Sequence, residues 1–306
     1  MAAYLAAGVA VTNLDPAPPR RESDIDAWKR ADITNSDELK AVLSEVQPTH
    51  VFHLGARTDL RGGGVGDYSA NVAGVAAILA ALEECTPSLA RLVVASSRMV
   101  CRIGYNPTSD EDYCPTTAYG TSKVETERLV RAETSLPWVL VRPTSIWGPW
   151  FETPYRDFFM SVARNRYVHP AGRRIPKHFG FVGNTAWQLH KVMTAPEREV
   201  LNRTFYLADA PPIEVRDLAD RISATLGQRR VRSIPLPLLR LAARAGDALD
   251  RTGRTSPLTS FRLDNLLTPM LYDLDNLNAV AGAPPFDLDT AVEQTVDWMR
   301  SQSLVR

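Results

Sequence analysis

Short apolar runs alternate with helix-like patterns through the first half of this chain, and this alternation restricts the fold more than any other feature. The apolar runs expected to form strands are residues 9–14, 49–54, 92–95 and 138–142. The segments between them with apolar residues at helical spacing are 36–45, 71–84 and 121–134. Strands joined by helices of this length form right-handed crossovers. The sequence therefore predicts an α/β fold with a doubly wound parallel sheet.

The pattern loosens after about residue 150, where proline-containing loops separate shorter elements. One more strand is expected at 204–207, and helices are expected at 158–163, 215–226, 236–249 and 290–301. These elements predict a doubly wound domain over residues 1–150. They also predict a smaller lobe over residues 151–306, some of whose segments return to the first domain.

The composition is that of an ordinary globular chain. Of the 306 residues, 44% are hydrophobic and 23% are charged, and 35 basic residues balance 35 acidic ones, so charge gives no reason to expect a nucleic-acid partner. Cys85, Cys101 and Cys114 are odd in number and unevenly spaced, which indicates reduced thiols and a cytoplasmic setting. No cysteine and histidine cluster predicts a metal site. No stretch approaches the roughly 18 apolar residues of a membrane span, and the apolar start lacks the basic region of a signal peptide.

Tyr119 and Lys123 lie four residues apart, which places both side chains on one face of a helix. A free phenol has a pKa of about 10 and exchanges protons poorly at neutral pH. A nearby ammonium stabilises the phenolate, so we expect Lys123 to lower the pKa of Tyr119 and to let it exchange a proton with an alcohol. The same spacing also occurs on solvated helix faces, so the pair alone is not specific.

Ser96 and Ser97 follow the expected strand 92–95 and supply the missing context. Ligands of open α/β sheets bind beyond the carboxyl ends of the strands. A serine hydroxyl at that edge can hydrogen-bond the substrate oxygen that Tyr119 protonates, although two serines also make a plain strand-ending turn. A strand, two serines, a loop and then a Tyr-x-x-x-Lys helix together predict a nicotinamide-dependent oxidoreductase.

Four segments make the sequence recognisable. They are His53-Leu54-Gly55-Ala56, Asn71-Val72-Ala73-Gly74, Ser96-Ser97-Arg98-Met99-Val100 and Arg142-Pro143-Thr144-Ser145-Ile146-Trp147-Gly148-Pro149. Together they resemble the extended short-chain dehydrogenase/reductase family, and more narrowly its NAD-dependent epimerase/dehydratase group, over nearly the whole chain. The resemblance implies a Rossmann-type NAD-binding domain over residues 1–150 and a substrate-binding lobe over most of 151–306.

The resemblance also assigns roles to residues. It implies that Ser97 acts with Tyr119 and Lys123 as the catalytic residues. It implies that Asp15 accepts hydrogen bonds from both ribose hydroxyls of NAD and repels the 2′-phosphate of NADP, a preference that the nearby Arg20 and Arg21 could soften. The residues expected to bind NAD are Asp15, Asp32, Ile33, Leu54, Gly55, Ala56, Asn71, Ala95, Ser96, Tyr119, Lys123 and Pro143. Asp32 suits a plain turn or helix cap equally well.

Departures from the family pattern bear on the substrate. Arg98 and Met99 stand where the family's dehydratases carry an acid–base pair, so we expect no dehydration of a sugar. Ser145 replaces an asparagine that touches the sugar nucleotide. Lys177 keeps a cation at the diphosphate position but lacks the bidentate fork of arginine. The residues expected to bind substrate are Arg98, Thr144, Ser145 and Lys177.

The function implied by these residues is NAD-dependent hydride transfer on a nucleotide-linked sugar, with epimerisation preferred to simple reduction. The first alternative is a ketoreductase or a hydroxysteroid-dehydrogenase-like enzyme that acts on a non-nucleotide substrate. The second is a catalytically weak relative that binds a cofactor or a partner, although Ser97, Tyr119 and Lys123 together argue against it. The resemblance also implies a homodimer built by the helices 71–84 and 121–134.

The expected helix 236–249 carries Arg240 and Arg244 on one face, as helices that lie on a membrane surface do. The alternative is an amphipathic lid over the substrate lobe. We favour the lid, because no basic cluster flanks the helix.

The family's opening strand and its Gly-x-x-Gly-x-x-Gly loop, whose backbone amides meet the cofactor pyrophosphate, have no counterpart in this sequence. Residues 1–7 match the end of the helix that follows the loop, with Gly8 as its cap and 9–14 as the second strand. We therefore expect a misplaced start or a truncation. Without the central strand, its neighbours in the sheet would lack ladder partners.

Overall fold

The computed structural model describes residues 1–252, 256 and 258–305, which divide into two compact units. Unit 1 consists of Met1–Arg102, Pro107–Arg142 and Met193–Phe205. Unit 2 consists of Ile103–Asn106, Pro143–Val192 and the described chain from Tyr206 onward. Each unit has its own hydrophobic core.

Unit 1 is built on a four-stranded sheet with the order β10–β5–β4–β3. Its strands are β3 (His50–His53), β4 (Arg91–Ala95), β5 (Trp138–Pro143) and β10 (Thr204–Leu207), the last of which continues into unit 2. β3, β4 and β5 run parallel. Nearly every residue of β4 and β5 is buried, as in the central strands of a parallel sheet. The predicted α/β fold with a parallel sheet is confirmed.

A separate parallel sheet pairs β1 (Asn13–Leu14) with β2 (Trp28–Lys29). Only the end of the predicted strand 9–14 finds a ladder partner, so the strand is shorter than expected. Among the described residues, neither β1 nor β2 joins the ladder of β3. Helix α1 (Ala2–Ala6) precedes β1 and is followed by Gly8, whose φ of 74° is a conformation that glycine adopts without strain.

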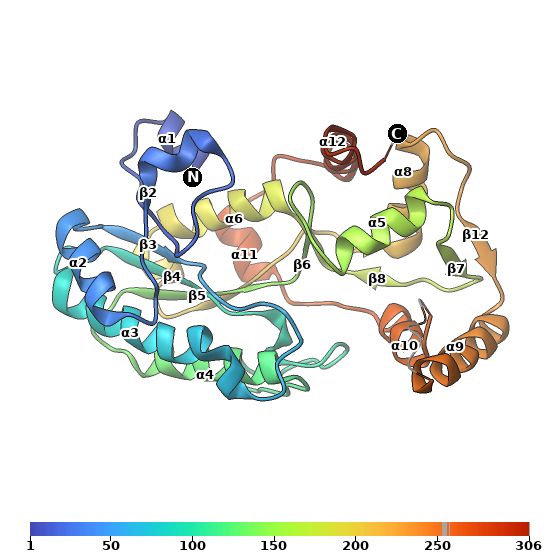
Figure 1. Ribbon diagram of the computed structural model, residues 1–306, viewed down its shortest axis with the longest axis horizontal. Helices are drawn as coiled ribbons and strands as arrows, with labels where there is room; N and C mark the ends of the chain where they lie inside the picture. Colours follow the sequence, from blue (N-terminus) through green and yellow to red (C-terminus); the bar gives the residue numbers. More distant parts are fainter. Residues whose placement is uncertain (253–255, 257, 306) are drawn as a thin grey trace. The chain divides into compact units, whose positions relative to one another are not determined.

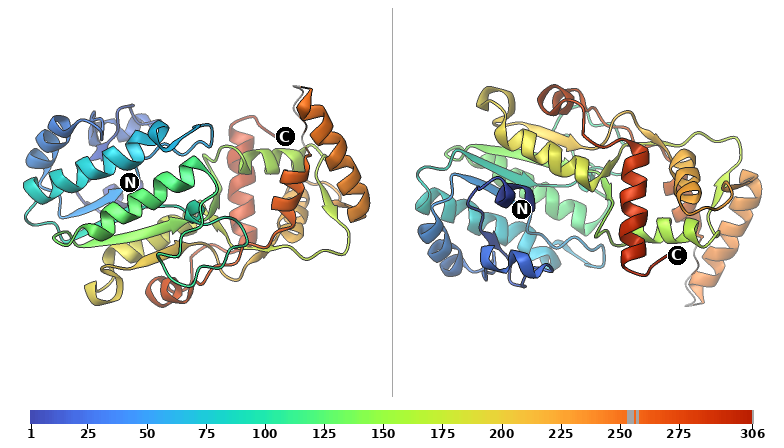
Figure 2. Two further views of the ribbon diagram at one scale, coloured as in Figure 1. Left: turned by 90° about the horizontal axis from the view of Figure 1, so that it is seen from below. Right: turned by 90° about the horizontal axis from the view of Figure 1, so that it is seen from above.

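Helices α2 (Ser36–Val46), α3 (Ser69–Cys85) and α4 (Ala118–Ala132) lie side by side along one face of the four-stranded sheet (Figures 1 and 2). The core of unit 1 fills the space between these helices and β4 and β5. Helix α4 starts before the predicted residue 121, because Thr117 caps it. The Oγ1 atom of Thr117 accepts a hydrogen bond from the amide of Gly120 at 2.9 Å. Tyr119 therefore lies inside the first helical turn. The short helices of unit 1 are η1 (Glu22–Ala27), η2 (Val65–Tyr68), η3 (Arg98–Val100) and α7 (Glu197–Val200).

The continuous helical segment formed by η2 and α3, Val65–Cys85, has 21 residues and contains an 18-residue stretch with a mean hydropathy of 1.4, so by length and composition it could cross a membrane. The expectation that no stretch approaches such a length is therefore wrong. However, α3 contacts both α2 and α4, and its residues Val75, Ile78 and Leu82 belong to the core of unit 1. The core helix of a folded unit meets the same criteria of length and composition, and α3 is packed as such a helix.

Unit 2 combines short strand pairs with helices. The pairs are β6 (Ser145–Trp147) with β9 (Phe179–Phe181), β7 (Val168–Pro170) with β12 (Arg232–Ile234), and β8 (Pro176–Lys177) with β11 (Ile213–Glu214). The helices are α5 (Tyr155–Ala163), α6 (Val182–Thr194, whose last residues lie in unit 1), α8 (Val215–Thr225), α9 (Leu236–Arg251), α10 (Ser260–Leu267), α11 (Asp275–Ala281) and α12 (Leu288–Ser301). The predicted helices 158–163, 215–226, 236–249 and 290–301 are confirmed, with small changes at their ends.

The larger core of unit 2 is rich in aromatic rings and lies among α5, α8 and α12. The ring of Trp147 lies 5.3 Å from that of Phe159 and 5.4 Å from that of Phe181. A second, smaller cluster joins α9 to α10. These two clusters hold the strand pairs and helices of unit 2 together.

Candidate active site

The carboxyl end of β4 leads into Ser96 and Ser97, and the first turn of α4 brings Tyr119 to the same place. Ser97 and Tyr119 are both buried and share a side-chain hydrogen bond. Ser97 also caps η3, because its Oγ accepts a hydrogen bond from the amide of Met99 at 3.1 Å. The ends of a strand and two helices thus fix the positions of both hydroxyls, as proton exchange between them and a substrate requires.

Burial raises the pKa of the Tyr119 phenol above its ordinary value, because a buried phenolate loses its hydration. The hydrogen bond with Ser97 and the positive charge of Arg98 lower this pKa, and Tyr68 raises it. The expectation that Lys123 lowers the pKa of Tyr119 is not met in this arrangement. The cation that does so is Arg98, which was expected to bind substrate.

Lys123 is 2% exposed, and its ammonium donates a hydrogen bond to the carbonyl oxygen of Ala95 at 2.8 Å. Burial lowers the pKa of Lys123 to about 8, while the negative charge of Glu127, one turn further along α4, raises it. A lysine with such a pKa can gain or lose a proton close to neutral pH. Its bond to Ala95 also fastens α4 to the carboxyl end of β4, so the ammonium positions the helix that carries Tyr119.

His53 is the last residue of β3, and its imidazole lies close enough to Lys123 for the charge of the lysine to affect its pKa. Its imidazole is buried, and its Nε2 atom has no hydrogen-bond partner within the described part of the chain. Burial and the charge of Lys123 lower the pKa of His53 to about 4, so the ring is neutral near pH 7. A buried ring nitrogen without a partner costs free energy unless a ligand or a water molecule bonds to it. The unused nitrogen therefore fits a hydroxyl-bearing ligand, such as the ribose of NAD, at this edge of the sheet.

Glu127, which lies one turn beyond Lys123 on α4, forms a buried ion pair with Arg142. The carboxylate of Glu127 and the guanidinium of Arg142 are joined by hydrogen bonds of 2.7 and 2.8 Å. The same carboxylate accepts hydrogen bonds from Ser96 at 2.6 Å and from Tyr113 at 3.0 Å, and burial raises the pKa of Tyr113 to about 12. Ser96, which was predicted to bind NAD, thus uses its hydroxyl inside the protein. The pair joins α4 to β5 and to the end of β4.

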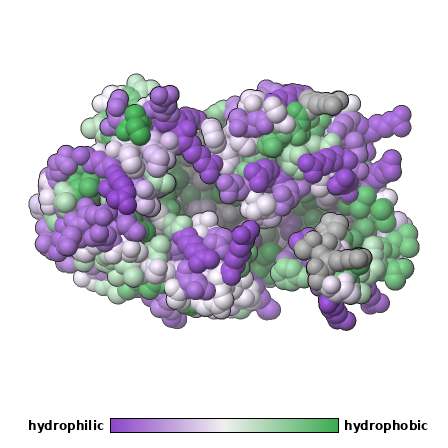
Figure 3. Space-filling view, viewed as in Figure 1, coloured by the Kyte–Doolittle hydropathy of each residue, from purple (hydrophilic) through white to green (hydrophobic). Residues whose placement is uncertain are grey.

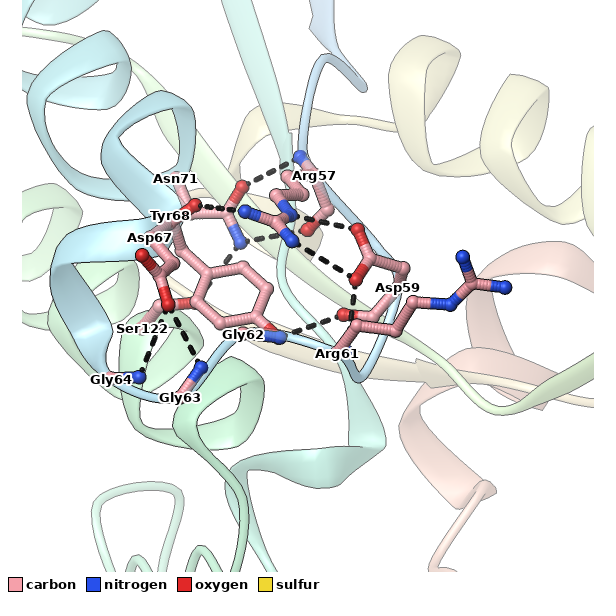
Figure 4. Close-up of polar contacts among 10 residues, drawn as sticks. All are labelled: Arg57, Asp59, Arg61, Gly62, Gly63, Gly64, Asp67, Tyr68, Asn71 and Ser122. Carbon is pink, nitrogen blue, oxygen red and sulfur yellow. Dashed lines mark hydrogen bonds and ion pairs between the residues drawn. The ribbon is translucent and has the colours of Figure 1, made fainter.

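The loop between β3 and α3 folds around Tyr68, as Figure 4 shows. The hydroxyl of Tyr68 accepts a hydrogen bond from the amide of Gly62 at 3.2 Å and donates one to the carbonyl of Asp59 at 2.8 Å. The guanidinium of Arg57 lies 5.1 Å from the centre of the Tyr68 ring. That ring centre lies 5.9 Å from the centre of the Tyr119 ring. The ring of Tyr68 therefore packs against the ring of Tyr119 and helps to fix its position.

Asn71, which was predicted to bind NAD, holds the same loop. Its Oδ1 accepts a hydrogen bond from the amide of Arg57 at 2.8 Å. Its Nδ2 donates to the carbonyl of Arg57 and to Ser122, both at 3.0 Å (Figure 4). The side chain of Asn71 thus links α3, α4 and the loop, and its amide is occupied within unit 1.

Two predicted NAD-binding acids lie near the short sheet of β1 and β2. Asp15 follows β1, is exposed, and accepts a hydrogen bond from the amide of Ala17 at 2.8 Å. Asp32 accepts hydrogen bonds from the amide and hydroxyl of Thr34, which lower the pKa of Asp32 and keep it ionised. Both carboxylates therefore accept hydrogen bonds from residues two positions further along the chain, and so stabilise local turns. Their contact with a cofactor stays a prediction.

The remaining predicted cofactor residues surround the ends of β3, β4 and β5. Ile33 packs against Gly74, where a Cβ atom would lie 2.9 Å from the Ile33 side chain, so the glycine allows this close approach. Leu54 and Gly55 follow β3 and are exposed. The others are Ala56, in the same loop, Ala95, which bonds Lys123, and Pro143, which ends β5.

The predicted substrate-binding residues of unit 2 have partners inside the protein. The Oγ1 atom of Thr144 donates a hydrogen bond to a backbone carbonyl at 2.9 Å. Ser145 is buried, and its Oγ accepts a hydrogen bond from a neighbouring tyrosine at 2.5 Å. Lys177 is buried, and its ammonium donates a hydrogen bond to a backbone carbonyl at 2.7 Å. Arg98, the fourth predicted residue, lies in unit 1.

Reasoning from the sequence missed Glu127, Tyr68 and the buried imidazole of His53. Glu127 had a signal, because it continues the four-residue spacing of Tyr119 and Lys123 along the same helix face. Tyr68 had none, because its contact with Tyr119 joins segments that are distant in the sequence.

Comparisons with known proteins agree with this geometry. Residues 1–197 match the model of the NAD dependent epimerase/dehydratase family. The 3 beta-hydroxysteroid dehydrogenase/Delta 5→4-isomerase of Mycobacterium tuberculosis is 28% identical over 291 residues, which are 89% of this chain and 75% of the relative. The N-acetyl-alpha-D-glucosaminyl-diphospho-ditrans,octacis-undecaprenol 4-epimerase of Escherichia coli is 23% identical over 76% of this chain and 71% of the relative. The structure of a UDP-glucuronic acid 4-epimerase from Bacillus cereus, solved with UDP-glucuronic acid and NAD, has 14% identity and a TM-score of 0.71, covering 98% of this chain and 94% of that one.

Proposed function

Because this chain belongs to the NAD-dependent epimerase/dehydratase family, we propose that it uses NAD to oxidise a secondary alcohol, or to reduce the matching ketone, on a lipophilic carbon skeleton. The polar side chains of Thr144, Ser145 and Lys177 all form hydrogen bonds with other groups of the protein. This observation is the reason for proposing a lipophilic substrate. A nucleotide diphosphate needs free cations and hydrogen-bond donors around its oxygens. A lipophilic skeleton needs none of these polar groups.

The name of one curated relative supports the same class, because it is named for a hydroxysteroid, whose hydroxyl lies on a lipophilic skeleton. The other relative is named for a sugar joined through a diphosphate to undecaprenol, and its name fits the alternative of a sugar substrate.

The residues of this chain handle the proton. Bound NAD would supply the hydride acceptor for oxidation of the alcohol, and NADH would supply the donor for reduction of the ketone. In oxidation, the C–H bond breaks with its electron pair leaving as hydride, and the hydroxyl proton passes to the oxygen of Tyr119. Ser97, which is hydrogen-bonded to Tyr119, holds the substrate oxygen beside it. Arg98 stabilises the phenolate needed for oxidation. Since burial raises the pKa of Tyr119, the free protein holds the protonated phenol, which is the form needed for reduction.

The role of Tyr119 is tested by Tyr119→Phe, which removes the hydroxyl and keeps the ring against Tyr68. We expect turnover to fall by at least about 10²-fold, the loss typical of a general acid–base group, with unchanged circular dichroism. Tyr4→Phe is the matched control, because it removes a tyrosine hydroxyl from α1 and should leave turnover unchanged. Near-normal turnover of Tyr119→Phe would remove Tyr119 from the mechanism.

The substrate class is tested with NAD and two sets of compounds. One set contains lipophilic secondary alcohols, including a 3β-hydroxysteroid, and the other contains UDP-glucose and UDP-N-acetylglucosamine. We expect NADH from the first set and no epimer from the second. Epimer formation would return the substrate to a nucleotide-linked sugar, the first choice from the sequence, and would leave the role of Tyr119 intact.

We also propose a cofactor preference, an oligomeric state and a cellular setting for this chain. NAD is preferred to NADP because Asp15 repels a 2′-phosphate, and titration with both cofactors tests this preference. The homodimer pairs α3 and α4 of two copies, and light scattering measures its mass. The cytoplasmic setting follows from the reduced cysteines expected from the sequence.

A further inference from the structure

Helix α9 has two apolar faces on opposite sides. Its inner face contains Leu236, Leu239, Ala243 and Gly246, all buried and repeating at helical spacing. Apart from the glycine, these residues belong to the cluster that α9 shares with α10. At Gly246 the approach is so close that a Cβ atom would lie 1.8 Å from a backbone oxygen. This face accounts for the attachment of α9 to unit 2.

The outer face of α9 repeats the same spacing two residues further along. Leu238, Leu241 and Leu249 are 57%, 65% and 45% exposed, and the alanines between them on this side are exposed as well. Phe261, in the neighbouring α10, is 74% exposed. Figure 3 shows the resulting apolar surface at its lower right, over α9 and α10. Isolated exposed leucines are common, but a stripe along a whole helix marks a contact surface.

Positive charge borders this stripe. Arg240, Arg244 and Arg251 are exposed along one edge of α9, and the first two make no ion pair with any residue that the structure describes. The acids of α9 are bonded within unit 2. Asp247 accepts two hydrogen bonds from Ser260, at 2.9 and 2.5 Å, and Asp250 accepts one from Ser256 at 2.6 Å. These bonds leave Asp247 and Asp250 negatively charged, but both lie toward the end of α9, so the unpaired positive charge along the border is concentrated at Arg240 and Arg244.

Two shallow hollows adjoin the same edge. One has a volume of about 310 Å³ and is lined by Arg173, Arg174 and Arg240, together with apolar residues. The other has a volume of about 250 Å³ and is lined by Arg240 and Arg244 together with the carboxylate of Asp264. Guanidinium groups bind phosphate oxygens with paired hydrogen bonds. The first hollow, which no acidic residue lines, is therefore suited to a phosphate group beside the apolar stripe, whereas Asp264 makes the second less suited to one.

We infer that α9 rests on an anionic phospholipid surface. The outer leucines enter the boundary between headgroups and acyl chains, and Arg240 and Arg244 lie among the lipid phosphates. Apolar residues on one face with arginines along its edge are the arrangement of helices that lie in the plane of a membrane interface. The sequence alone favoured a lid. The inner face packs on unit 2 as the apolar face of a lid would, and the exposed leucines of the outer face are the part of α9 that a lid leaves unexplained.

A second copy of this chain is a weaker occupant of the same face. A stable protein–protein interface takes roughly 20–30 residues from each partner. The exposed apolar residues of α9 and α10 fall well short of that number. A phospholipid surface needs no such extended complementarity, and it supplies the negative charge that the bordering arginines lack.

The inference is tested by sedimenting the full chain with phosphatidylcholine vesicles, with and without phosphatidylglycerol. The measurement uses neither NAD nor substrate, so it is independent of the proposed function. We expect binding to the phosphatidylglycerol vesicles, little binding to phosphatidylcholine alone, and weaker binding as salt rises. Arg240→Gln/Arg244→Gln should weaken binding by at least about tenfold, because each arginine near an anionic surface contributes measurably to affinity. Leu238→Gln/Leu241→Gln should weaken it by a similar factor.

The matched control is Arg198→Gln/Arg229→Gln, which removes two exposed arginines from other positions and should bind as the wild type does. Circular dichroism checks that each variant is folded. Absence of binding to phosphatidylglycerol vesicles would overturn the inference. So would binding that the α9 variants leave unchanged. A self-association that Leu238→Gln/Leu241→Gln abolishes, without vesicle binding, would assign the face to a second copy and equally overturn it.

Discussion

A surface helix usually buries apolar side chains and exposes polar ones, and helices α4 and α9 depart from this rule in opposite ways. α4 buries polar and charged side chains, including Lys123 and Glu127, whereas α9 exposes a row of leucines. Both arrangements cost free energy, because buried charges lose hydration and exposed apolar surface remains in water. In α4 the cost is offset inside the protein, by Arg142 and by the Ala95 carbonyl. In α9 nothing within the described chain covers the outer face. The comparison indicates that α4 serves internal chemistry and that α9 serves an external contact.

Glu127→Ala removes the carboxylate that pairs with Arg142, and it should have the largest effect on the free energy of unfolding. The variant leaves the guanidinium of Arg142 buried without its carboxylate. We expect the free energy of unfolding to fall by about 3–5 kcal/mol, the cost of removing one partner from a buried ion pair. Urea unfolding followed by circular dichroism measures the change.

Glu125→Ala is the control on the same helix. Glu125 and its partner Arg128 are 39% and 60% exposed, so removing this pair should cost less than about 1 kcal/mol. Equal losses in the two variants would mean that the buried pair has no special role in holding α4.

The pH dependence of stability sharpens the comparison for Lys123. Its pKa is about 8 in the folded chain against an ordinary value of 10.5, so between these values the unfolded chain holds a proton that the folded chain has lost. Stability therefore rises with pH through this window, by about 3 kcal/mol for a shift of that size. Below pH 8 the lysine is charged in both states and its contribution is constant.

Lys123→Met supplies the reference for this measurement, because it lacks the titrating group and other titrations cancel in the difference. Unfolding free energies of the two proteins should diverge in favour of the wild type from pH 8 to pH 10.5. A difference that stays constant over this range would show that Lys123 keeps its ordinary pKa.

The sequence predicted most of the fold, because apolar periodicity is a local property. The helix 36–45 and the strands 92–95 and 138–142 appear in the structure with small changes at their ends. The strand 9–14 is too long in the prediction, because a strand needs a ladder partner and only Asn13 and Leu14 have one. The start of α4 was misplaced, although Thr117 is a recognisable cap.

The candidate site was predicted less completely, because its support comes from long-range contacts. The spacing of Tyr119 and Lys123 predicted their shared helix face, but the sequence did not show that Lys123 would bond Ala95. It also did not show that Asn71 and Ser96 would use their polar groups within unit 1. Motif spacing identifies residue types, whereas hydrogen-bond partners depend on the folded arrangement.

Arg98→Met tests whether the charge beside Tyr119 acts on its phenol. The arginine lowers the pKa of Tyr119, so its removal should raise that pKa further. Oxidation needs the phenolate, and the pH at half-maximal alcohol oxidation should therefore move upward. Ketone reduction near pH 7 should change little. Arg98→Lys keeps the charge and should retain the wild-type profile, whereas an unshifted profile in Arg98→Met would assign the pH dependence to another group.

Leu238→Gln and Leu241→Gln should have the smallest effect on folding. Each side chain is mostly exposed, so its replacement removes no packing within unit 2, and we expect the free energy of unfolding to change by less than about 0.5 kcal/mol. Leu239→Gln is the matched change on the inner face, where the leucine is buried in the cluster with Leu263. It should cost about 3 kcal/mol, because it buries an amide without a partner. A loss above about 1 kcal/mol in the outer variants would mean that the isolated protein already covers this face, and the contrast between α4 and α9 would no longer hold.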